Sequence, residues 1–380
     1  MNWNIPLSDL SFGAEELLAV QKVLESRWLT MGVVTREFEQ AFEQFNQVRH
    51  AIAVTNGTAA LHLACLAAGL GPGDEAIVPS LTFVATANAI RYTGATPVFA
   101  EIENLTDLNI SPASIEEKIN ARTKAIMVVH YAGYACDMAA IRTLAKKYHL
   151  KVIEDAAHAV GSVLDGKKLG CWSDIGCFSF FSNKNMTTGE GGMLVTDDDE
   201  IAAKLRLMRS HGMTTLTWDR HQGHAQGYDV VALGYNYRID EVRSAMGIVQ
   251  LSKLERNNER RRELTRVYWS AFHERIPEII TPFTNHRGLS AAHILPVLLP
   301  VGTVRNLVME RLKNQGIQSS CHYPPIHLFS IYRTPTGDKP ASLPTTEEVA
   351  VREITLPLYP SMTPENAITV VNALQAALNE

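Results

Sequence analysis

The 380-residue sequence contains none of the features that mark membrane, secreted or nucleic-acid-binding proteins. No apolar run approaches the ~20 residues needed to cross a bilayer, and the N-terminus has no charged stretch followed by an apolar one. Long basic runs are also missing, and the formal net charge of -5 argues against a nucleic-acid partner. We therefore expect a protein with neither a membrane nor a nucleic-acid partner.

Cysteine is scarce, with five residues, an odd number that includes no C-x-x-C pair. They are Cys65, Cys136, Cys171, Cys177 and Cys321. Several lie in apolar surroundings, as reduced thiols of a cytoplasmic protein do. The sequence therefore predicts a cytoplasmic localisation.

Hydrophobic residues make up 46% of the chain and charged residues 20%, which is typical of a globular protein with an ample core. A chain of this length predicts one large domain and one smaller one. From about residue 33 to 245, apolar strand segments alternate with helical ones, the pattern of a mostly parallel sheet covered on both faces. The expected strands are 51–54, 75–79, 96–100, 125–130, 151–154, 175–180 and 193–196, and the expected helices include 58–68, 86–93, 111–121 and 138–148.

A long amphipathic helix is predicted from Asp240, its capping residue, toward Trp269. Its charged stretch, residues 255–262, is interpreted as a solvated face. Shorter elements follow, among them a strand at 292–299 and a helix at 304–314.

Lys184 lies between an apolar run, residues 178–182, and a glycine-bearing turn, residues 189–192, that leads into a second apolar run. A lysine in a short loop between two buried strands is typical of Schiff-base chemistry, because burial lowers its pKa and frees the amine. The ordinary alternative is a surface lysine in a hairpin. The sequence upstream favours the first interpretation.

Asp155 follows the expected strand 151–154, at its carboxyl end, where ligands bind in open α/β sheets. A carboxylate there can pair with the ring nitrogen of pyridoxal phosphate and keep it protonated, so that the ring acts as an electron sink. His158 would lie close to the same ring. Taken alone, Asp155 could equally be a helix cap.

A phosphate site is predicted at Asn56-Gly57-Thr58, between the strand 51–54 and an alanine-rich helix. Backbone N–H groups point outward at a helix N-terminus, and a glycine lets a phosphate approach the backbone closely. A simple capped helix is the alternative.

Taken in order, the phosphate turn, Asp155-x-x-His158, and Ser179-x-x-x-x-Lys184 followed by Thr-Thr-Gly-Glu-Gly-Gly resemble the DegT/DnrJ/StrS-type sugar aminotransferases of the fold type I pyridoxal phosphate superfamily. The similarity runs from Trp28 to His327. It implies an α/β, aspartate-aminotransferase-like fold, with a seven-stranded mostly parallel sheet in the large domain and a smaller α+β domain. We expect an N-terminal arm and helix at 1–30, the large cofactor-binding domain at 31–254 and the small domain at 255–380.

The resemblance also implies roles for individual residues. Lys184 would bind the cofactor and act as the base, and Asp155 would hold the ring nitrogen. Phe83 would stack on the cofactor ring, and Gly57, Thr58 and Ser179 would bind its phosphate. The protein would be a homodimer with shared active sites, in which Asn236 of the partner subunit also contacts the phosphate. Tyr323 and His327 would contact the sugar. For the last two, a plain surface loop is an equal alternative. Residues 130–133 are expected to line the pocket.

The implied activity is transfer of an amino group from L-glutamate, or less commonly L-glutamine, to a keto sugar. The family mostly aminates keto sugars linked to a nucleotide diphosphate, in the biosynthesis of surface glycans or natural products, and some members use cyclitol ketones or sugar phosphates. For this chain the expected acceptor is a 4-keto or 3-keto deoxysugar linked to a nucleotide diphosphate. The motifs do not select the sugar, its nucleotide, the carbon aminated, the stereochemistry, the donor, or an assembly larger than a dimer.

Other functions are disfavoured by single residues. Sugar dehydratases of the same family carry a histidine in place of Lys184, and a non-catalytic regulatory protein would be expected to lose Lys184 or Asp155. Residues 161–168 nearly match a P-loop, but Lys168 replaces the hydroxyl residue that would hold magnesium. The glycines of residues 69–73 follow a helix instead of a strand, so they do not form a dinucleotide-binding fingerprint.

A metal site is not expected. His221 and His224 lie in a loop without a plausible third ligand. The acidic run at residues 197–200 follows a strand and opens a helix, which suits a helix cap.

Overall fold

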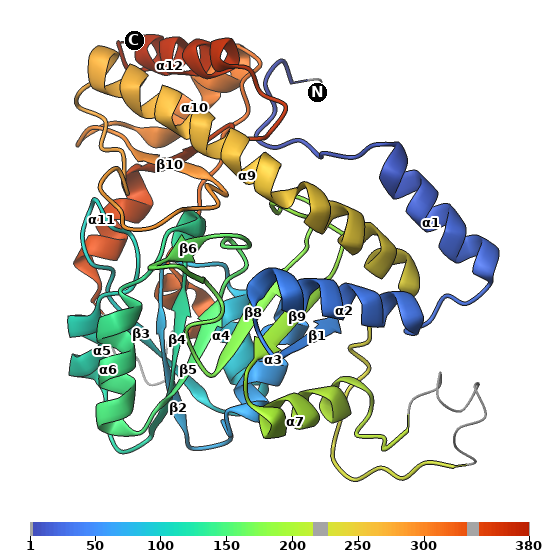
Figure 1. Cartoon of the computed structure of the whole chain (residues 1–380). Helices are drawn as coiled ribbons and strands as arrows, with labels where there is room; N and C mark the ends of the chain where they lie inside the picture. The colour runs from blue at the N-terminus through green and yellow to red at the C-terminus, as the bar shows by residue number, and fades with distance from the viewer. Residues whose placement is uncertain (1–2, 216–226, 333–341, 380) are drawn as a thin grey trace.

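The computed structural model describes residues 3–215, 227–332 and 342–379, and His221 and His224 lie outside them. Its centre is a seven-stranded sheet in the order β1-β9-β8-β5-β4-β2-β3 (Figure 1). The strands are β1 (His50–Val54), β2 (Glu75–Pro79), β3 (Thr96–Ala100), β4 (Thr123–Val129), β5 (Lys151–Asp155), β8 (Ile175–Ser179) and β9 (Gly192–Thr196). Only β9 runs antiparallel to its neighbours, β1 and β8. The predicted fold class is confirmed, and each expected strand lies within two residues of an observed one.

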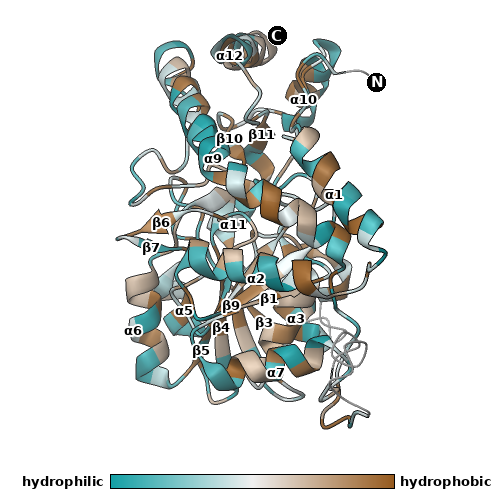
Figure 2. Ribbon diagram, turned by 45° about the vertical axis from the view of Figure 1, so that its right-hand side comes forward, coloured by the Kyte–Doolittle hydropathy of each residue, from teal (hydrophilic) through white to brown (hydrophobic). Residues whose placement is uncertain are grey.

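Helices cover both faces of this sheet. One face packs against α2 (Val33–Asn46), α5 (Pro112–Lys118) and α6 (Met138–Tyr148). The other packs against α3 (Gly57–Ala67), α4 (Ala85–Tyr92) and α7 (Asp199–Arg209). Because side chains alternate along a strand, Val152 joins the first core and Ile153 the second. Figure 2 shows hydrophobic residues concentrated along the central strands and polar ones on the outer helices.

A second part of the chain has its own core. It contains a two-stranded antiparallel sheet of β10 (Leu295–Leu298) and β11 (Glu353–Leu356), flanked by α10 (Arg305–Asn314) and α12 (Pro364–Asn379). The helix α11 (Pro344–Arg352) precedes β11, and the short 3-10 helices η2 (Ile326–Leu328) and η3 (Ser330–Tyr332) precede α11. A third 3-10 helix, η1 (Tyr131–Gly133), follows β4 of the large sheet. The N-terminal arm packs here through a bridge between Ile5 and Ile317.

The helix α9 (Glu241–Arg275) joins the two parts (Figure 1). Asp240 caps it as predicted, its carboxylate accepting from the Arg243 N–H at 2.9 Å. The helix α1 (Ala14–Ser26) packs against α9. Because α9 is continuous through residue 255, the predicted domain boundary lies inside a helix and stays a prediction.

The prediction of a solvated face at residues 255–262 is wrong for half of that stretch. Asn257, Asn258, Arg261 and Arg262 are buried. Arg261 donates from Nη1 to the carbonyl oxygens of His293 and Leu358, at 3.0 and 2.8 Å. The middle of α9 passes between the two cores, so other segments of the chain cover it on more than one side. Its buried polar side chains therefore bind backbone carbonyls of those segments.

The disfavoured nucleotide motif has a simple explanation in the structure. Residues 161–168 contain a hairpin of β6 (Val163–Leu164) and β7 (Lys167–Lys168) instead of the strand, loop and helix of a P-loop.

Among the described residues, no helix is long and apolar enough to cross a membrane. No group of three or more potential metal-ligating side chains occurs in the described part of the chain.

Candidate active site

A cavity of about 450 Å³ opens at the carboxyl edge of the sheet. Strands β4, β5 and β8 each contribute their last residue to its wall, namely Val129, Asp155 and Ser179. Most of the residues singled out from the sequence line this one cavity: Gly57, Thr58, Phe83, Asp155, His158, Ser179, Lys184 and Tyr323. Segments more than 250 residues apart in the sequence thus meet at a single site.

One end of the cavity is formed by the N-terminus of α3. Asn56 caps this helix, with Oδ1 accepting from the Ala59 N–H at 2.8 Å. Gly57 passes so close to Ser179 that a Cβ built on it would lie 2.8 Å from the Ser179 Cβ. A Cβ on Gly192 would lie 2.5 Å from the Asn56 carbonyl oxygen. The glycines therefore let a helix N-terminus and the Ser179 hydroxyl converge on one small space.

Asp155 is buried in the wall of the cavity. Its Oδ2 accepts from the Thr86 hydroxyl at 2.9 Å, and its Oδ1 accepts from the Ala157 N–H at 3.1 Å. Burial raises the pKa of this carboxyl, although both hydrogen bonds and the charge of Lys184 act in the opposite direction. Because the buried negative charge has been removed from water, a cationic ligand that reaches the carboxylate would interact with it strongly.

Lys184 lies in the loop between β8 and β9, where its N–H donates to the Phe181 carbonyl oxygen at 2.9 Å. Burial lowers the pKa of its ammonium to about 8, an effect that the carboxylate of Asp155 partly offsets. A lysine with this pKa is still mostly protonated at neutral pH, but it holds far more free amine than an ordinary lysine does, and the free amine is the form that attacks a carbonyl carbon.

His158 and Tyr323 form a second wall. His158 Nδ1 accepts from the Ala132 N–H at 3.3 Å, so the neutral imidazole carries its proton on Nε2. That nitrogen lies 3.0 Å from the Tyr323 hydroxyl, to which it donates. The hydroxyl proton of Tyr323 is consequently available to a ligand in the cavity. Burial lowers the pKa of His158 well below its usual range, which keeps the ring neutral.

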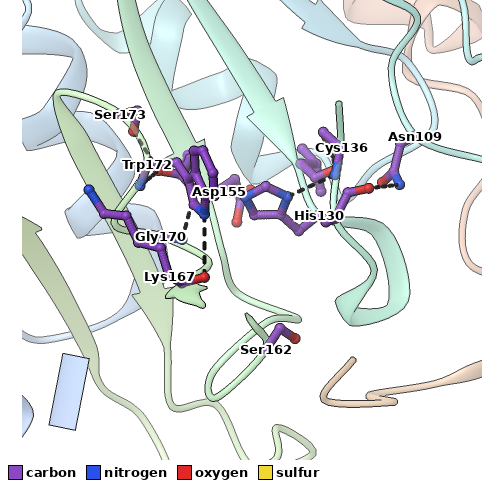
Figure 3. Close-up of polar contacts among 12 residues, drawn as sticks. Asn109, His130, Cys136, Asp155, Ser162, Lys167, Gly170, Trp172 and Ser173 are labelled. Atoms are coloured by element: carbon purple, nitrogen blue, oxygen red, sulfur yellow. Dashed lines mark hydrogen bonds and ion pairs between the residues drawn. The ribbon is translucent and has the colours of Figure 1, made fainter. Parts of the chain in front are cut away.

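The expectation that residues 130–133 line the cavity is wrong. His130 belongs to a network on the opposite face of β5, where its Nε2 donates to the Glu154 carboxylate at 2.9 Å. Its Nδ1 accepts from the Cys136 N–H at 3.3 Å (Figure 3). Glu154 also accepts from the N–H groups of Gly170 and Trp172 and from the Ser173 hydroxyl, each at 2.7 Å. Successive residues of a strand point to opposite faces, so this network lies behind the cavity wall.

A model of the DegT/DnrJ/EryC1/StrS aminotransferase family matches residues 11–375 of the chain. The chain belongs to this family. A relative in Bacillus subtilis (strain 168), the spore coat polysaccharide biosynthesis protein SpsC, is 40% identical over 379 residues, which cover 98% of this chain and 97% of SpsC.

Two solved structures, PseC and DesI, superpose on nearly the full chain. Helicobacter pylori PseC, an aminotransferase involved in the biosynthesis of pseudoaminic acid, matches with a TM-score of 0.90 and 32% identity, covering 100% of both chains. DesI, determined in the presence of its TDP-sugar product, matches with a TM-score of 0.86 and 32% identity, covering 97% of this chain and 90% of DesI. The chain is thus an aminotransferase of a sugar-aminotransferase family, as its motifs predicted.

The family implies pyridoxal phosphate, and the residues of this aminotransferase fit that group. The glycine-lined space at the start of α3 offers N–H and hydroxyl donors for a phosphate. Asp155 is a buried carboxylate suited to a protonated ring nitrogen, and Lys184 offers an amine for the aldehyde carbon. Phe83, although 57% exposed, lies at the cavity and contacts the Tyr323 ring with centroids 6.0 Å apart.

Two predicted residues of this aminotransferase do not reach the cavity of the single chain. Asn236 is exposed and does not line it. His327 is buried elsewhere, with Nδ1 2.6 Å from the Ser80 hydroxyl and Nε2 3.2 Å from the Glu347 carboxylate. The Ser80 and Glu347 contacts leave the predicted sugar contact of His327 without geometric support.

Two other residues of the site have no signal in the sequence. Thr86 follows Phe83 by one turn and bonds Asp155, and His293 lies 3.3 Å from the Lys184 amine. His293 comes from the segment before β10, 109 residues after Lys184. An isolated histidine in an apolar segment is usually a core residue, so only the tertiary structure could identify it.

Proposed function

We propose that this protein is a pyridoxal-phosphate-dependent aminotransferase that moves an amino group from L-glutamate or L-glutamine to a keto sugar. The observation that carries the proposal is the buried Lys184 amine, with its pKa of about 8, in one cavity with the buried Asp155 carboxylate. The acceptor that we propose is a 3-keto or 4-keto deoxysugar linked to a nucleotide diphosphate. The TDP-sugar product of DesI and the polysaccharide role in the name of SpsC support this class of acceptor and a role in surface glycans or natural products.

The cofactor, when bound, supplies an electron-accepting ring that stabilises negative charge at the substrate carbon. Lys184 Nζ takes the proton from the donor α-carbon and delivers it within the cavity, as a positioned general base. Asp155 holds the ring nitrogen protonated. Gly57 and Thr58 N–H groups and the Ser179 hydroxyl hold the phosphate, which orients the reacting carbon toward Nζ.

Tyr323 is the sugar contact that we retain from the segment 322–327. Its hydroxyl accepts from His158 and can therefore donate its own proton to an oxygen of the acceptor. We do not retain His327, because its imidazole is buried between Ser80 and Glu347.

We also propose a homodimer in which Asn236 of the partner subunit reaches the cofactor phosphate. Several large apolar side chains that an isolated chain would leave in water support an interface. Leu17, Leu18 and Leu24 on α1 are 76%, 52% and 55% exposed, and Leu233 beside Asn236 is 83% exposed. Such surface on one molecule is typical of an interaction site.

We place the protein in the cytoplasm. All five cysteines are free thiols, and four of them are buried. Unpaired thiols suit a reducing compartment.

The test is the absorbance spectrum of the purified protein, reconstituted with pyridoxal phosphate, before and after addition of L-glutamate. We expect a visible band from the lysine-bound cofactor, converted by glutamate to the absorbance of the pyridoxamine form. Conversion by L-glutamine alone would identify the other donor. A protein that shows no band after reconstitution would contradict the proposal.

A further inference from the structure

His293 contacts the amine of Lys184 from a different part of the chain. The two nitrogens, Lys184 Nζ and His293 Nε2, lie 3.3 Å apart. His293 is 3% exposed, and unlike Lys184 it does not line the main cavity. His293 therefore contacts Nζ without lining the cavity where the substrate would bind.

The neighbouring Asn185 determines which nitrogen of His293 carries the proton. Asn185 has one side-chain atom 2.7 Å from the Ala291 carbonyl oxygen, which can only accept a hydrogen bond, so that atom is Nδ2. Its Oδ1 consequently faces His293 Nδ1, at 2.7 Å. An amide oxygen only accepts, so Nδ1 of His293 must donate, and in the neutral ring Nε2 is left as an acceptor for the Lys184 N–H.

Asn258 on α9 holds Asn185 in this orientation. Its Nδ2 donates to the Val160 carbonyl oxygen at 2.9 Å, and its Oδ1 accepts the second proton of Asn185 Nδ2 at 2.7 Å. Asn258 is fully buried, and a Cβ on Gly161 would lie 2.7 Å from its Nδ2. Both amides are therefore fixed by backbone carbonyls, and neither can flip without placing oxygen against oxygen.

The charges around His293 also keep its ring neutral. His158 lies against it with tilted rings whose centroids are 4.4 Å apart, and Arg261 donates to its carbonyl oxygen. Lys184 and His322 are further neighbours that act electrostatically on the ring. Burial first, and then these neighbouring groups, lower the pKa of His293 well below its usual range. The imidazole is thus an acceptor over the whole pH range in which Lys184 titrates.

We propose that His293 is a positioning residue for the catalytic lysine: it accepts one N–H of the free Lys184 amine and so turns the lone pair of Nζ toward the cavity. This inference rests on the proposed function, because it assigns His293 a role in the same active site, next to the lysine that the proposed function makes catalytic. The expected benefit is orientation, since a lysine on a flexible four-carbon stem is otherwise free to rotate away from the carbon that it must deprotonate.

Two amide variants separate this role from simple packing. In His293→Gln, the longer side chain can place an acceptor near the position of Nε2, whereas His293→Asn reaches only the position of Nδ1. In the cofactor-free protein, the pKa of Lys184 is measured from the pH dependence of its acetylation by acetic anhydride, with the labelled peptide quantified by mass spectrometry. We expect a value of about 8 in the unchanged protein and His293→Gln. It should fall by about one unit in His293→Asn, because an acceptor stabilises the ammonium more than the amine.

The second readout is the donor half-reaction of the reconstituted protein. We expect kcat of His293→Asn to fall by roughly 10- to 100-fold with a nearly unchanged KM for the donor, and His293→Gln to recover most of the loss. Equal losses in both variants together with an unchanged Lys184 pKa would reduce His293 to a structural residue and overturn the inference. So would normal values of both readouts in His293→Asn.

The acetylation measurement keeps this inference separate from the proposed function, because it needs no cofactor or substrate. If the unchanged protein does not transaminate but the Lys184 pKa still falls in His293→Asn, the proposed function fails and the contact between the two residues stands. If His293→Asn does not fold, His293→Met fills a similar volume without a strong acceptor and is expected to lower the Lys184 pKa in the same way.

Discussion

Glu154 and Asp155 are consecutive residues of β5, and their carboxylates lie on opposite faces of the sheet. Glu154 accepts hydrogen bonds from His130, Gly170, Trp172 and Ser173, and Asp155 lines the cavity. One strand end therefore carries two buried acids with different tasks. The first is saturated with donors and supports the wall, and the second retains the capacity to hold a cationic ligand.

Glu154→Gln should destabilise the protein, because its amide NH₂ would face two hydrogen-bond donors in place of an oxygen. We expect the free energy of unfolding at pH 7 to fall by about 3–5 kcal/mol, as for other broken buried pairs. Although burial acts to raise it, the hydrogen bonds lower the pKa of Glu154 below 4.5, so its contribution is complete above that pH and is lost as the pH falls through the folded pKa. The difference between the two proteins should then shrink in acid.

Urea unfolding of both proteins at pH 7 and at pH 4 measures this effect. Glu116→Gln is the control, since its carboxylate is exposed and pairs with Lys147 and Tyr148 at the surface, and it should behave like the unchanged protein. A stable Glu154→Gln protein would show that the network does not support the sheet.

Asp155→Asn should separate stability from activity. Burial raises the pKa of Asp155, so the cofactor-free protein is destabilised at pH values where this carboxylate is charged. The amide removes that charge, and we expect the cofactor-free variant to unfold at the same or a higher urea concentration at pH 7. Turnover should fall at least ~10²-fold, because no charge then keeps the ring nitrogen protonated. A clearly less stable cofactor-free variant would be inconsistent with this assignment.

Lys184→Ala should abolish transamination while the protein stays folded. We expect a loss of ~10³-fold or more, since both the cofactor attachment and the general base disappear, and the visible absorbance of lysine-bound cofactor should vanish with it. Lys151→Ala is the matched control, because Lys151 pairs with Asp174 at the surface, at the far end of β5. Normal turnover in Lys184→Ala would refute the central assignment.

Gly57→Ala should weaken cofactor binding. The added Cβ would lie 2.8 Å from the Ser179 Cβ and 3.3 Å from its Cα, so the phosphate end of the cavity must shift. We expect the dissociation constant for pyridoxal phosphate to rise by roughly tenfold or more, measured by titration of the visible absorbance. At Gly71 a Cβ would meet only Asp74 Oδ2, 4.0 Å away, and Gly71→Ala should bind normally. Equal affinities would place the phosphate elsewhere.

Asn236→Ala tests the shared active site through complementation. If Asn236 of the partner subunit completes each site, a dimer of one Lys184→Ala chain and one Asn236→Ala chain contains one intact site. After the two inactive proteins are mixed and allowed to exchange subunits, about a quarter of the normal activity should appear. Mixing Lys184→Ala with the double variant gives no intact site and should remain inactive. Activity no greater than the sum of the separate variants would contradict the shared site.

Much of this site follows from local sequence. Asp155, Ser179 and Gly57 lie at a strand end or in the first turn of a helix, and the carboxyl ends of parallel strands meet at one edge of a sheet. Alternation along β5 likewise separates Asp155 from the face of Glu154. The strand positions, the seven-stranded sheet and the cavity-lining motif residues could therefore be predicted before any coordinates were known.

The tertiary structure alone decided the contacts between distant segments. It brought His293 to Lys184 across 109 residues, buried Arg261 where a charge pattern indicated a solvated face, and kept His327 out of the cavity. A residue pattern reports the period of a helix or strand, and it does not say which other segment covers that element. Burial by a second core is a property of the packed chain, and it determines which polar side chains meet the catalytic lysine.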